Sequence, residues 1–188
     1  MLDSGERFHL AIQEMQHGSP EKAIEHLKSC LEDEPGNAKA LYLLGALHAQ
    51  IGMYERSIEE MTQAIEMDNS LTIARFQLGL LHFTSGNNEQ AVEVWSGLDS
   101  LGDSNYLYLF KRGLLQSLDN NFTGCMSDLE QGILLNTENE ALNNDMKTMI
   151  SSAKRALTEV EANTTSIESL STPSTKASSL SAYTQDND

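Results

Sequence analysis

The side chains best suited to chemistry are the histidines and cysteines, and their spacing argues against a catalytic or metal centre. His48 and His82 lie 34 residues apart, one period of an internal repeat. Equivalent residues of stacked helical repeats are separated by roughly a helix-packing distance, on the order of 10 Å. Ligands of one metal ion must each approach it to about 2 Å. We therefore interpret both histidines as packing residues with one hydrogen-bonded ring nitrogen.

The two cysteines, Cys30 and Cys125, are predicted to lie on helices three repeats apart. Their α-carbons are then far beyond the roughly 7 Å limit for a disulfide, and both positions favour small core residues, which predicts buried free thiols. The sequence has no phosphate-binding glycine loop, nucleophile elbow or zinc-ligand spacing. We predict a non-enzymatic protein without a metal or cofactor.

Composition narrows the class of partner. The chain has 188 residues and a formal net charge of −16, with 39% hydrophobic residues. Such acidity disfavours nucleic acid and anionic membranes as partners, because both attract cationic surfaces. No apolar run approaches the ~18 residues of a membrane span, and the N-terminal segment MLDSGERFHL lacks the pattern of a signal peptide. The expected location is the cytoplasm.

An internal repeat of 34 residues organises the chain. Five columns of similar residues recur in phase, and repeats of this kind indicate a stack of identical supersecondary units. The columns are Ala11, Gly45, Gly79 and Gly113; Gly18, Gly52, Gly86 and Asn120; Ala23, Ser57, Ala91 and Cys125; Ile24, Ile58, Val92 and Met126; and Leu27, Met61, Trp95 and Leu129. The predicted units are 4–37, 38–71, 72–105 and 106–139.

Each column has a structural meaning. Small residues in the first and third columns let two helices approach closely, and Gly or Asn in the second suits a left-handed residue just past a helix end. The large apolar residues of the other columns fill the space between the helices. Each unit is therefore predicted to be a helical hairpin, and Pro35 closes the first one.

This pattern resembles the tetratricopeptide repeat family over residues 4–139. The motifs that carry the resemblance are Leu44-Gly45, Leu78-Gly79, Ala23, Ala91, Trp95, Ala64 and Pro35. The resemblance implies an all-α, right-handed superhelix of four hairpins that acts as an interaction scaffold. Arg112 departs from the family pattern, which has leucine there. Gly97 and Gly102 predict a short or frayed second helix in the third unit and an irregular joint after it.

The chain after the repeats divides into two predicted segments. In 140–160, apolar residues follow a 3–4 spacing, which predicts a helix that caps the open end of the array. The alternative is a free amphipathic helix that binds a partner or pairs with itself. The segment 161–188 is rich in Ser and Thr and is predicted to be a disordered tail, because it cannot bury enough apolar surface.

The resemblance also implies a groove along the first helices. Family geometry places the second, fifth, ninth and twelfth positions of each unit on the concave face. The candidate peptide-binding residues on this face are Phe8, Tyr42, Ile73, Phe76, Leu80, Phe83, Leu107, Phe110 and Leu114. The only cations we place there are Lys39 and Lys111, too few for a clamp on a peptide's terminal carboxylate. An amphipathic helix or extended peptide with apolar anchors fits this surface better than a peptide held by its terminal carboxylate.

The predicted function is a cytoplasmic adaptor or chaperone-like scaffold that binds a protein or peptide segment in this groove. One narrower alternative is a chaperone of the type III secretion translocator class. Such chaperones carry an additional helix before the first repeat, whereas only Met1, Leu2 and Asp3 precede the first unit here. The structural alternative is self-association into a homodimer through the groove or the helix at 140–160.

Overall fold

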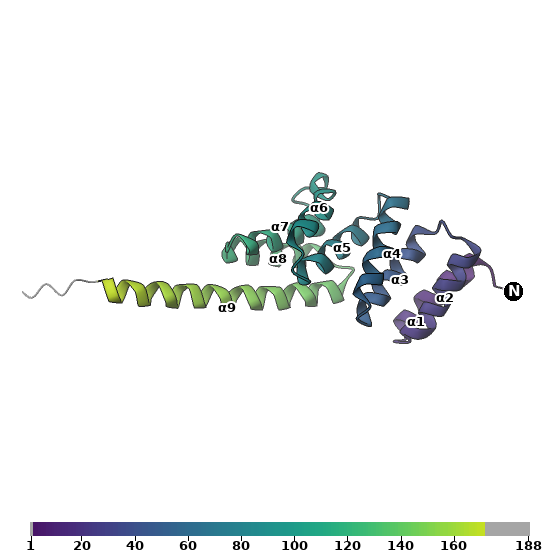
Figure 1. Cartoon of the computed structure of the whole chain (residues 1–188), viewed down its shortest axis with the longest axis horizontal. Helices are drawn as coiled ribbons and strands as arrows, with labels where there is room; N and C mark the ends of the chain where they lie inside the picture. Colours follow the sequence, from purple (N-terminus) through teal and green to yellow (C-terminus); the bar gives the residue numbers. More distant parts are fainter. Residues whose placement is uncertain (1, 172–188) are drawn as a thin grey trace, which may run out of the picture.

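The computed structural model describes residues 2–171, with side chains through residue 162, and in this part of the chain every regular element is helical. Eight helices form four consecutive antiparallel hairpins, and a long helix follows them (Figure 1). The elements are α1 (Ser4–Gln16), α2 (Pro20–Asp33), α3 (Ala38–Gln50), α4 (Tyr54–Met67), α5 (Thr72–Thr84), α6 (Asn88–Ser96), the 3-10 turn η1 (Asp99–Leu101), α7 (Tyr106–Leu118), α8 (Phe122–Leu135) and α9 (Glu140–Ser171).

The turn inside each hairpin repeats one backbone conformation. A single residue takes a positive φ in every turn: Gly18 (73°), Gly52 (81°), Gly86 (79°) and Asn120 (59°). Only glycine adopts this left-handed region without steric cost, and asparagine tolerates it better than most residues. The predicted role of this column is confirmed.

The column of helix glycines lets the two helices of a hairpin touch. A Cβ on Gly45 would lie 3.0 Å from Met61 Cγ, and one on Gly113 would lie 3.0 Å from the Cys125 carbonyl oxygen. A Cβ on Gly79 would overlap the indole of Trp95. The predicted close approach at this column is therefore confirmed, although the atoms approached differ from unit to unit.

The third hairpin is irregular, as the sequence predicts. Helix α6 has 9 residues, followed by η1 and by Gly102 at a φ of 70°. A Cβ on Gly97 would lie 2.7 Å from the Arg75 guanidinium and its Cδ, so the flexible arginine side chain would have to shift. The shortened helix places Trp95 in a fully buried position, where its Nε1 donates to the Phe76 carbonyl at 3.0 Å.

Arg112, which replaces the leucine of the family pattern, is held by acidic neighbours. Its Nε and Nη2 donate to the two carboxylate oxygens of Asp128 at 2.6 and 2.7 Å. Its Nη1 donates to Asp103 at 2.5 Å, and Gln116 also donates to Asp128, at 2.6 Å. The apolar contact is thus replaced by a hydrogen-bonded ion pair between α7 and α8.

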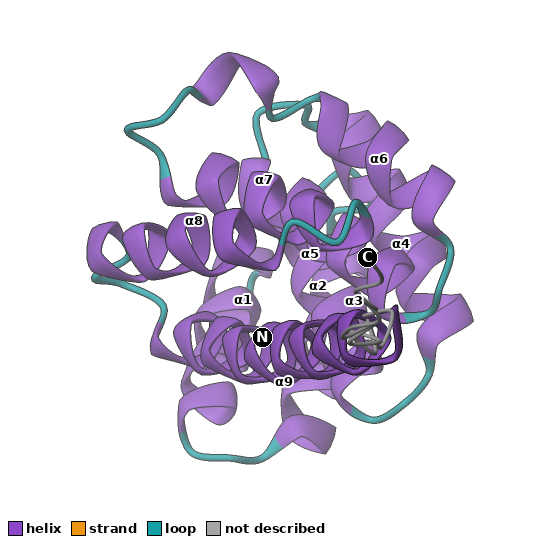
Figure 2. Cartoon of the chain, turned by 90° about the vertical axis from the view of Figure 1, so that its left-hand side faces the viewer, coloured by secondary structure: helices purple, strands orange, loops and turns teal. Residues whose placement is uncertain are grey.

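The hairpins stack into a right-handed superhelical solenoid, which confirms the predicted all-α fold. Figure 2 draws every regular element of the described residues as a helix. Two apolar cores run through it. The N-terminal core joins α1, α2 and α3 around Ala11, Leu27 and Leu44. The larger C-terminal core joins α5 to α9 and contains Phe76, Trp95, Phe110, Leu129 and Met146, among others.

Helix α9 packs beside α8 and then continues past the hairpins (Figure 1). Leu142, Met146 and Ala153 are buried in the C-terminal core, whereas Val160 is 50% exposed. The predicted helix boundary at residue 160 is wrong, since the helix runs to Ser171 through part of the predicted disordered tail. Adding residues to an existing helix avoids the cost of nucleation, so a polar segment can extend it. The rest of that tail, 172–188, lies outside the described residues.

Candidate binding cleft

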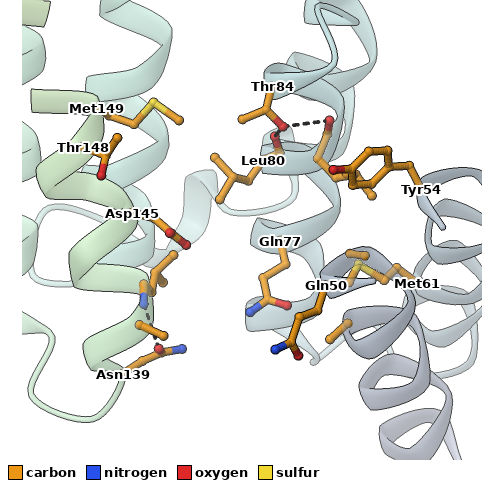
Figure 3. A pocket seen from close by; sticks show the side chains of 15 residues that line it. Gln50, Tyr54, Met61, Gln77, Leu80, Thr84, Asn139, Asp145, Thr148 and Met149 are labelled. Atoms are coloured by element: carbon orange, nitrogen blue, oxygen red, sulfur yellow. Dashed lines mark hydrogen bonds between the residues drawn. The ribbon is translucent and has the colours of Figure 1, made fainter. Parts of the chain in front are cut away.

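A cleft of about 580 Å³ lies between α9 and the first helices of the second and third hairpins (Figure 3). Its volume falls within the roughly 300–1,000 Å³ typical of ligand sites. The lining residues are Ala46, Ala49, Gln50, Tyr54, Met61, Gln77, Leu80, Leu81, Thr84, Asn139, Ala141, Leu142, Asp145, Thr148 and Met149. The site therefore combines an apolar surface with a few hydroxyl, amide and carboxylate groups.

One wall of the cleft belongs to the repeat array. Ala46 and Ala49 of α3 are small, which leaves space beside Leu80 and Leu81 of α5. The hydroxyl of Thr84 is directed back to its own helix, where it donates to the Leu80 carbonyl at 2.9 Å. This wall is consequently apolar over most of its extent.

The opposite wall is the first part of α9, and an asparagine network holds its joint with α8. Asn136 is buried and its Nδ2 donates to the Asn139 carbonyl and to the Asn143 side chain, both at 2.9 Å. The Asn143 amide donates in return to the Asn136 carbonyl at 2.9 Å. The side chain of Asn139 accepts from the Leu142 backbone N–H at 3.0 Å. These bonds fix the direction in which α9 leaves α8.

The electrostatics of the cleft depend on Asp145. Among the described residues that line it, Asp145 is the only one with a charged side chain. Figure 3 shows this side chain extending from α9 toward α5. Asp145 is exposed, but the walls of the cleft desolvate its carboxyl in part and raise its pKa, because desolvation disfavours the charged form.

Two aromatic residues that we predicted to line an open groove are core residues, and this prediction was wrong. Phe76 and Phe110 are both 0% exposed. The Phe76 ring stacks on Trp95 with a centroid distance of 5.8 Å. The Phe110 ring fills the space above Gly132, where a Cβ would collide with it. Each ring thus turns toward the second helix of its own hairpin.

The other predicted groove residues fall into three groups. Leu107 and Leu114 are buried in the C-terminal core, at 3% and 1% exposure, which again contradicts the prediction. Ile73, Leu80 and Phe83 are half-buried against that core, and Phe8 is half-buried against the N-terminal core. Tyr42 is also half-buried, and burial raises its pKa to about 12. Of all nine residues, Leu80 lines the cleft, while Phe83 and Leu114 line a second, smaller hollow against α9.

Lys111, expected on the inner face, is buried at 5% exposure. Its ammonium group donates to the Trp95 carbonyl at 3.2 Å and to the Asp99 carboxylate. Trp95 lies near the end of α6 and Asp99 in η1, so the irregular end of this hairpin brings both acceptors to it. This lysine is therefore a structural cation of the third joint, and the prediction that it faces the groove is wrong.

The histidines and cysteines occupy packing positions. His48 is buried, with Nδ1 at 2.5 Å from Glu60 Oε2, and Glu60 also accepts from Arg56 at 3.1 Å. The predicted hydrogen bond of a ring nitrogen is present for His48 but wrong for His82, whose Nδ1 is buried without a partner. Burial lowers the pKa of the His82 imidazole. Cys30 and Cys125 are buried free thiols, as predicted. In the described part of the chain, no three His, Cys, Asp or Glu side chains converge as metal ligands do.

Sequence reasoning missed the α9 wall of the cleft. The apolar stripe of 140–160 identifies the buried side of this helix, but Asp145 and Thr148 lie beside that stripe. Ala46 and Ala49 do belong to the predicted concave positions, yet their small size gave no sign of binding. The missing information was the position of α9 opposite α3 and α5, which no local pattern specifies.

A superhelix of stacked helical hairpins with a cleft on its inner side defines a class of repeat scaffolds. Residues 14–70 match the family described as tetratricopeptide repeat. The match identifies tetratricopeptide repeats in the first part of the chain, and the solved structures share the superhelical fold of the whole array. Proteins of this family are generally non-enzymatic scaffolds that bind other proteins.

Solved structures with the same fold are distant in sequence. MamA from Desulfovibrio magneticus RS-1 aligns with a TM-score of 0.59 and 18% identity, over 87% of this chain and 96% of that one. TTC0263, a thermophilic repeat protein of Thermus thermophilus, gives a TM-score of 0.65 at 14% identity, over 82% of each chain. The APC/C hetero-tetramer Cut9–Hcn1 gives a TM-score of 0.73 at 17% identity, over 85% of this chain and 31% of that one. No curated protein is significantly similar in sequence.

Proposed function

We propose that this protein is a non-enzymatic, cytoplasmic adaptor that binds a segment of another protein in the cleft between α3, α5 and α9. The repeat units 4–37, 38–71, 72–105 and 106–139 form the scaffold, and α9 supplies the second wall. The observation that carries the proposal is the cleft itself, which is largely apolar and open to solvent. Apolar surface that remains exposed on one face of a protein usually marks an interaction site.

The rim of the cleft supports a protein segment rather than a small molecule. Tyr54, which lines the cleft, is 53% exposed. Its neighbours in the turn before α4, Ile51 and Met53, are 48% and 42% exposed. A bound segment can therefore continue from the cleft across this turn and cover more apolar surface than the cleft alone contains. Across residues 2–171, no helix has both the length and the apolarity needed to cross a bilayer.

The test uses a bulky residue that fills the cleft. Thr148 lies on the α9 wall, is exposed, and bonds through its hydroxyl to the Asn144 carbonyl at 3.1 Å. Thr158 is its matched control, because it is exposed on the same helix and makes the equivalent bond to the Lys154 carbonyl at 3.0 Å, outside the cleft. Peptides selected from a displayed random library on the wild-type protein serve as probes, and their affinity is measured by fluorescence anisotropy.

We expect Thr148→Trp to weaken binding of the selected peptides at least tenfold and Thr158→Trp to leave it unchanged. Both variants should retain the wild-type circular dichroism spectrum, because both positions are exposed. If the two variants bind equally well, the cleft is not the binding site. Light scattering on the same samples reports self-association, and a dimer that dissociates in Thr148→Trp would assign the cleft to a second copy of the chain.

A further inference from the structure

We infer that the segment held in the cleft carries a lysine or arginine among its apolar side chains, and that this cation pairs with Asp145. The inference rests on the proposed function and specifies the chemistry of the partner. It follows from the state of the Asp145 carboxylate, from the lack of an internal cation that can reach it, and from the neutral character of the remaining surface.

The Asp145 carboxylate is left without a charge partner by the fold. Within the described residues, its side chain makes neither an ion pair nor a hydrogen bond, although it extends toward the opposite wall (Figure 3). Its environment disfavours the charged form and raises the pKa of the carboxyl. A cation bound next to the carboxylate reverses that effect, because an opposite charge within about 4–6 Å favours ionisation.

The cations of α9 do not turn toward Asp145. Residues one helical turn away from it, Ala141, Leu142, Thr148 and Met149, are uncharged. The side chain of Lys147 donates to the Asn144 side chain at 3.1 Å instead. On the opposite wall, α3 and α5 contribute the amides of Gln50 and Gln77, the hydroxyl of Thr84 and otherwise apolar residues. A cation at this position must therefore come with the ligand.

The remaining tail of the same chain cannot provide that cation. Its only basic residue is Lys176. From Asp145 to Ser171 the helix is continuous, which corresponds to about 39 Å at 1.5 Å per residue. The five residues from 172 to 176 span at most about 18 Å when fully extended. Lys176 thus cannot return to Asp145 of its own chain while α9 is intact, which favours a separate molecule as the source.

The rest of the surface defines the remainder of the ligand. Ala46, Ala49 and Leu80 accept apolar side chains on the array wall. Gln50 and Gln77 can donate to and accept from the backbone of a bound segment, as amide side chains carry both functions. The charge on the whole chain, −16, also favours a basic ligand, since it attracts cations at long range. A short apolar sequence with one basic residue satisfies all of these features.

The experiment is a double-mutant cycle between the protein and a library-selected peptide. The probes are the fluorescein-labelled peptide with the most enriched sequence and its analogue in which the basic residue is replaced by norleucine. The protein variants are Asp145→Asn and Glu159→Gln; Glu159 is an exposed acid on the same helix outside the cleft and controls for the loss of one negative charge. Affinity is measured by anisotropy at about 50 and 500 mM salt.

We expect the selected sequences to share a lysine or arginine between apolar positions. Asp145→Asn should weaken binding of the basic peptide roughly two- to fivefold, in the range of an exposed ion pair. On the wild-type protein, the norleucine analogue should bind more weakly than the basic peptide by the same factor. Its affinity should not fall further on the Asp145→Asn protein. Glu159→Gln should have little effect, and high salt should weaken the basic peptide more than its analogue.

The outcomes separate this inference from the proposed function. If the norleucine analogue binds as tightly as the basic peptide while Thr148→Trp abolishes binding of both, the cleft is the site and the inference is wrong. If Asp145→Asn and Glu159→Gln have equal effects, the attraction is general and the pairing is refuted. Competition by a synthetic peptide of residues 172–188 that depends on Asp145 would instead assign the cleft to the tail of a second copy.

Discussion

The substitution Gly79→Ala tests how closely the hairpin packing depends on one missing side chain. Gly79 lies on α5 opposite Trp95 of α6, and an added Cβ would overlap the indole ring. That indole is fully buried, stacks on Phe76 at a centroid distance of 5.8 Å and lies 5.8 Å from the centroid of Phe83. The methyl group and the ring cannot both keep these positions, so either the ring or a helix has to move.

Two effects of opposite sign decide the size of the change. Alanine in a helix is more favourable than glycine by about 1 kcal/mol. Forcing an extra methyl group into a packed core costs about 1–3 kcal/mol, and breaking the 3.0 Å hydrogen bond from Trp95 to the Phe76 carbonyl leaves buried polar atoms unpaired at about 1–3 kcal/mol more. The net expectation is a loss of about 3 kcal/mol in the free energy of unfolding.

Gly45→Ala is the matched control, because Gly45 holds the same column position one repeat earlier. Its added Cβ would lie 3.0 Å from Met61 Cγ and 3.3 Å from the Ser57 carbonyl oxygen, which are tight contacts but not the overlap found at Gly79, and the flexible methionine side chain can shift. We expect that variant to remain within about 1 kcal/mol of the wild type. Urea unfolding would be followed by far-ultraviolet circular dichroism and by the emission of the single tryptophan. A Gly79→Ala protein as stable as the wild type, with unchanged emission, would refute the packing argument.

Three further predictions concern buried side chains. Phe110→Ala should lower the unfolding free energy by about 3–5 kcal/mol, because Phe110 is a core residue. Phe8→Ala should lower it by less, because Phe8 is half-buried. Equal losses of unfolding free energy in urea would contradict this. Burial raises the pKa of the Cys125 thiol to about 11. At pH 8 a thiol reagent should therefore label this cysteine only as fast as the protein opens. Immediate labelling of the native protein would contradict the burial of Cys125. Burial lowers the pKa of His82, so the unfolded state binds this proton more tightly than the folded state, and stability should fall as pH drops below about 6.5. Titration of unfolding against pH should show a smaller fall for His82→Gln, and an unchanged pH dependence would exclude His82 as its source.

The sequence alone determined the features of the fold that depend on local backbone conformation and on repeated spacing. The glycines and Asn120 that follow the first helix of each hairpin required left-handed turns, and all four turns have them. The 34-residue column containing Gly45, Gly79 and Gly113 indicated close helix approach, which the hairpins show. Gly97 and Gly102 predicted the irregular joint after the third hairpin. Each of these inferences concerns a residue type whose effect is set by its own backbone or its nearest helix.

Only the tertiary structure decided which apolar residues remain accessible. Phe76 and Tyr42 share one column, yet Phe76 is in the core and Tyr42 is half-buried, because the first has Trp95 against it. The cleft, too, is decided by the tertiary structure. Asp145 became a candidate binding residue because α9 lies opposite α3 and α5, and that placement depends on the buried contacts of Leu142 and Met146 with other helices. Burial is a property of what packs against a residue, and a repeated sequence column does not contain that information.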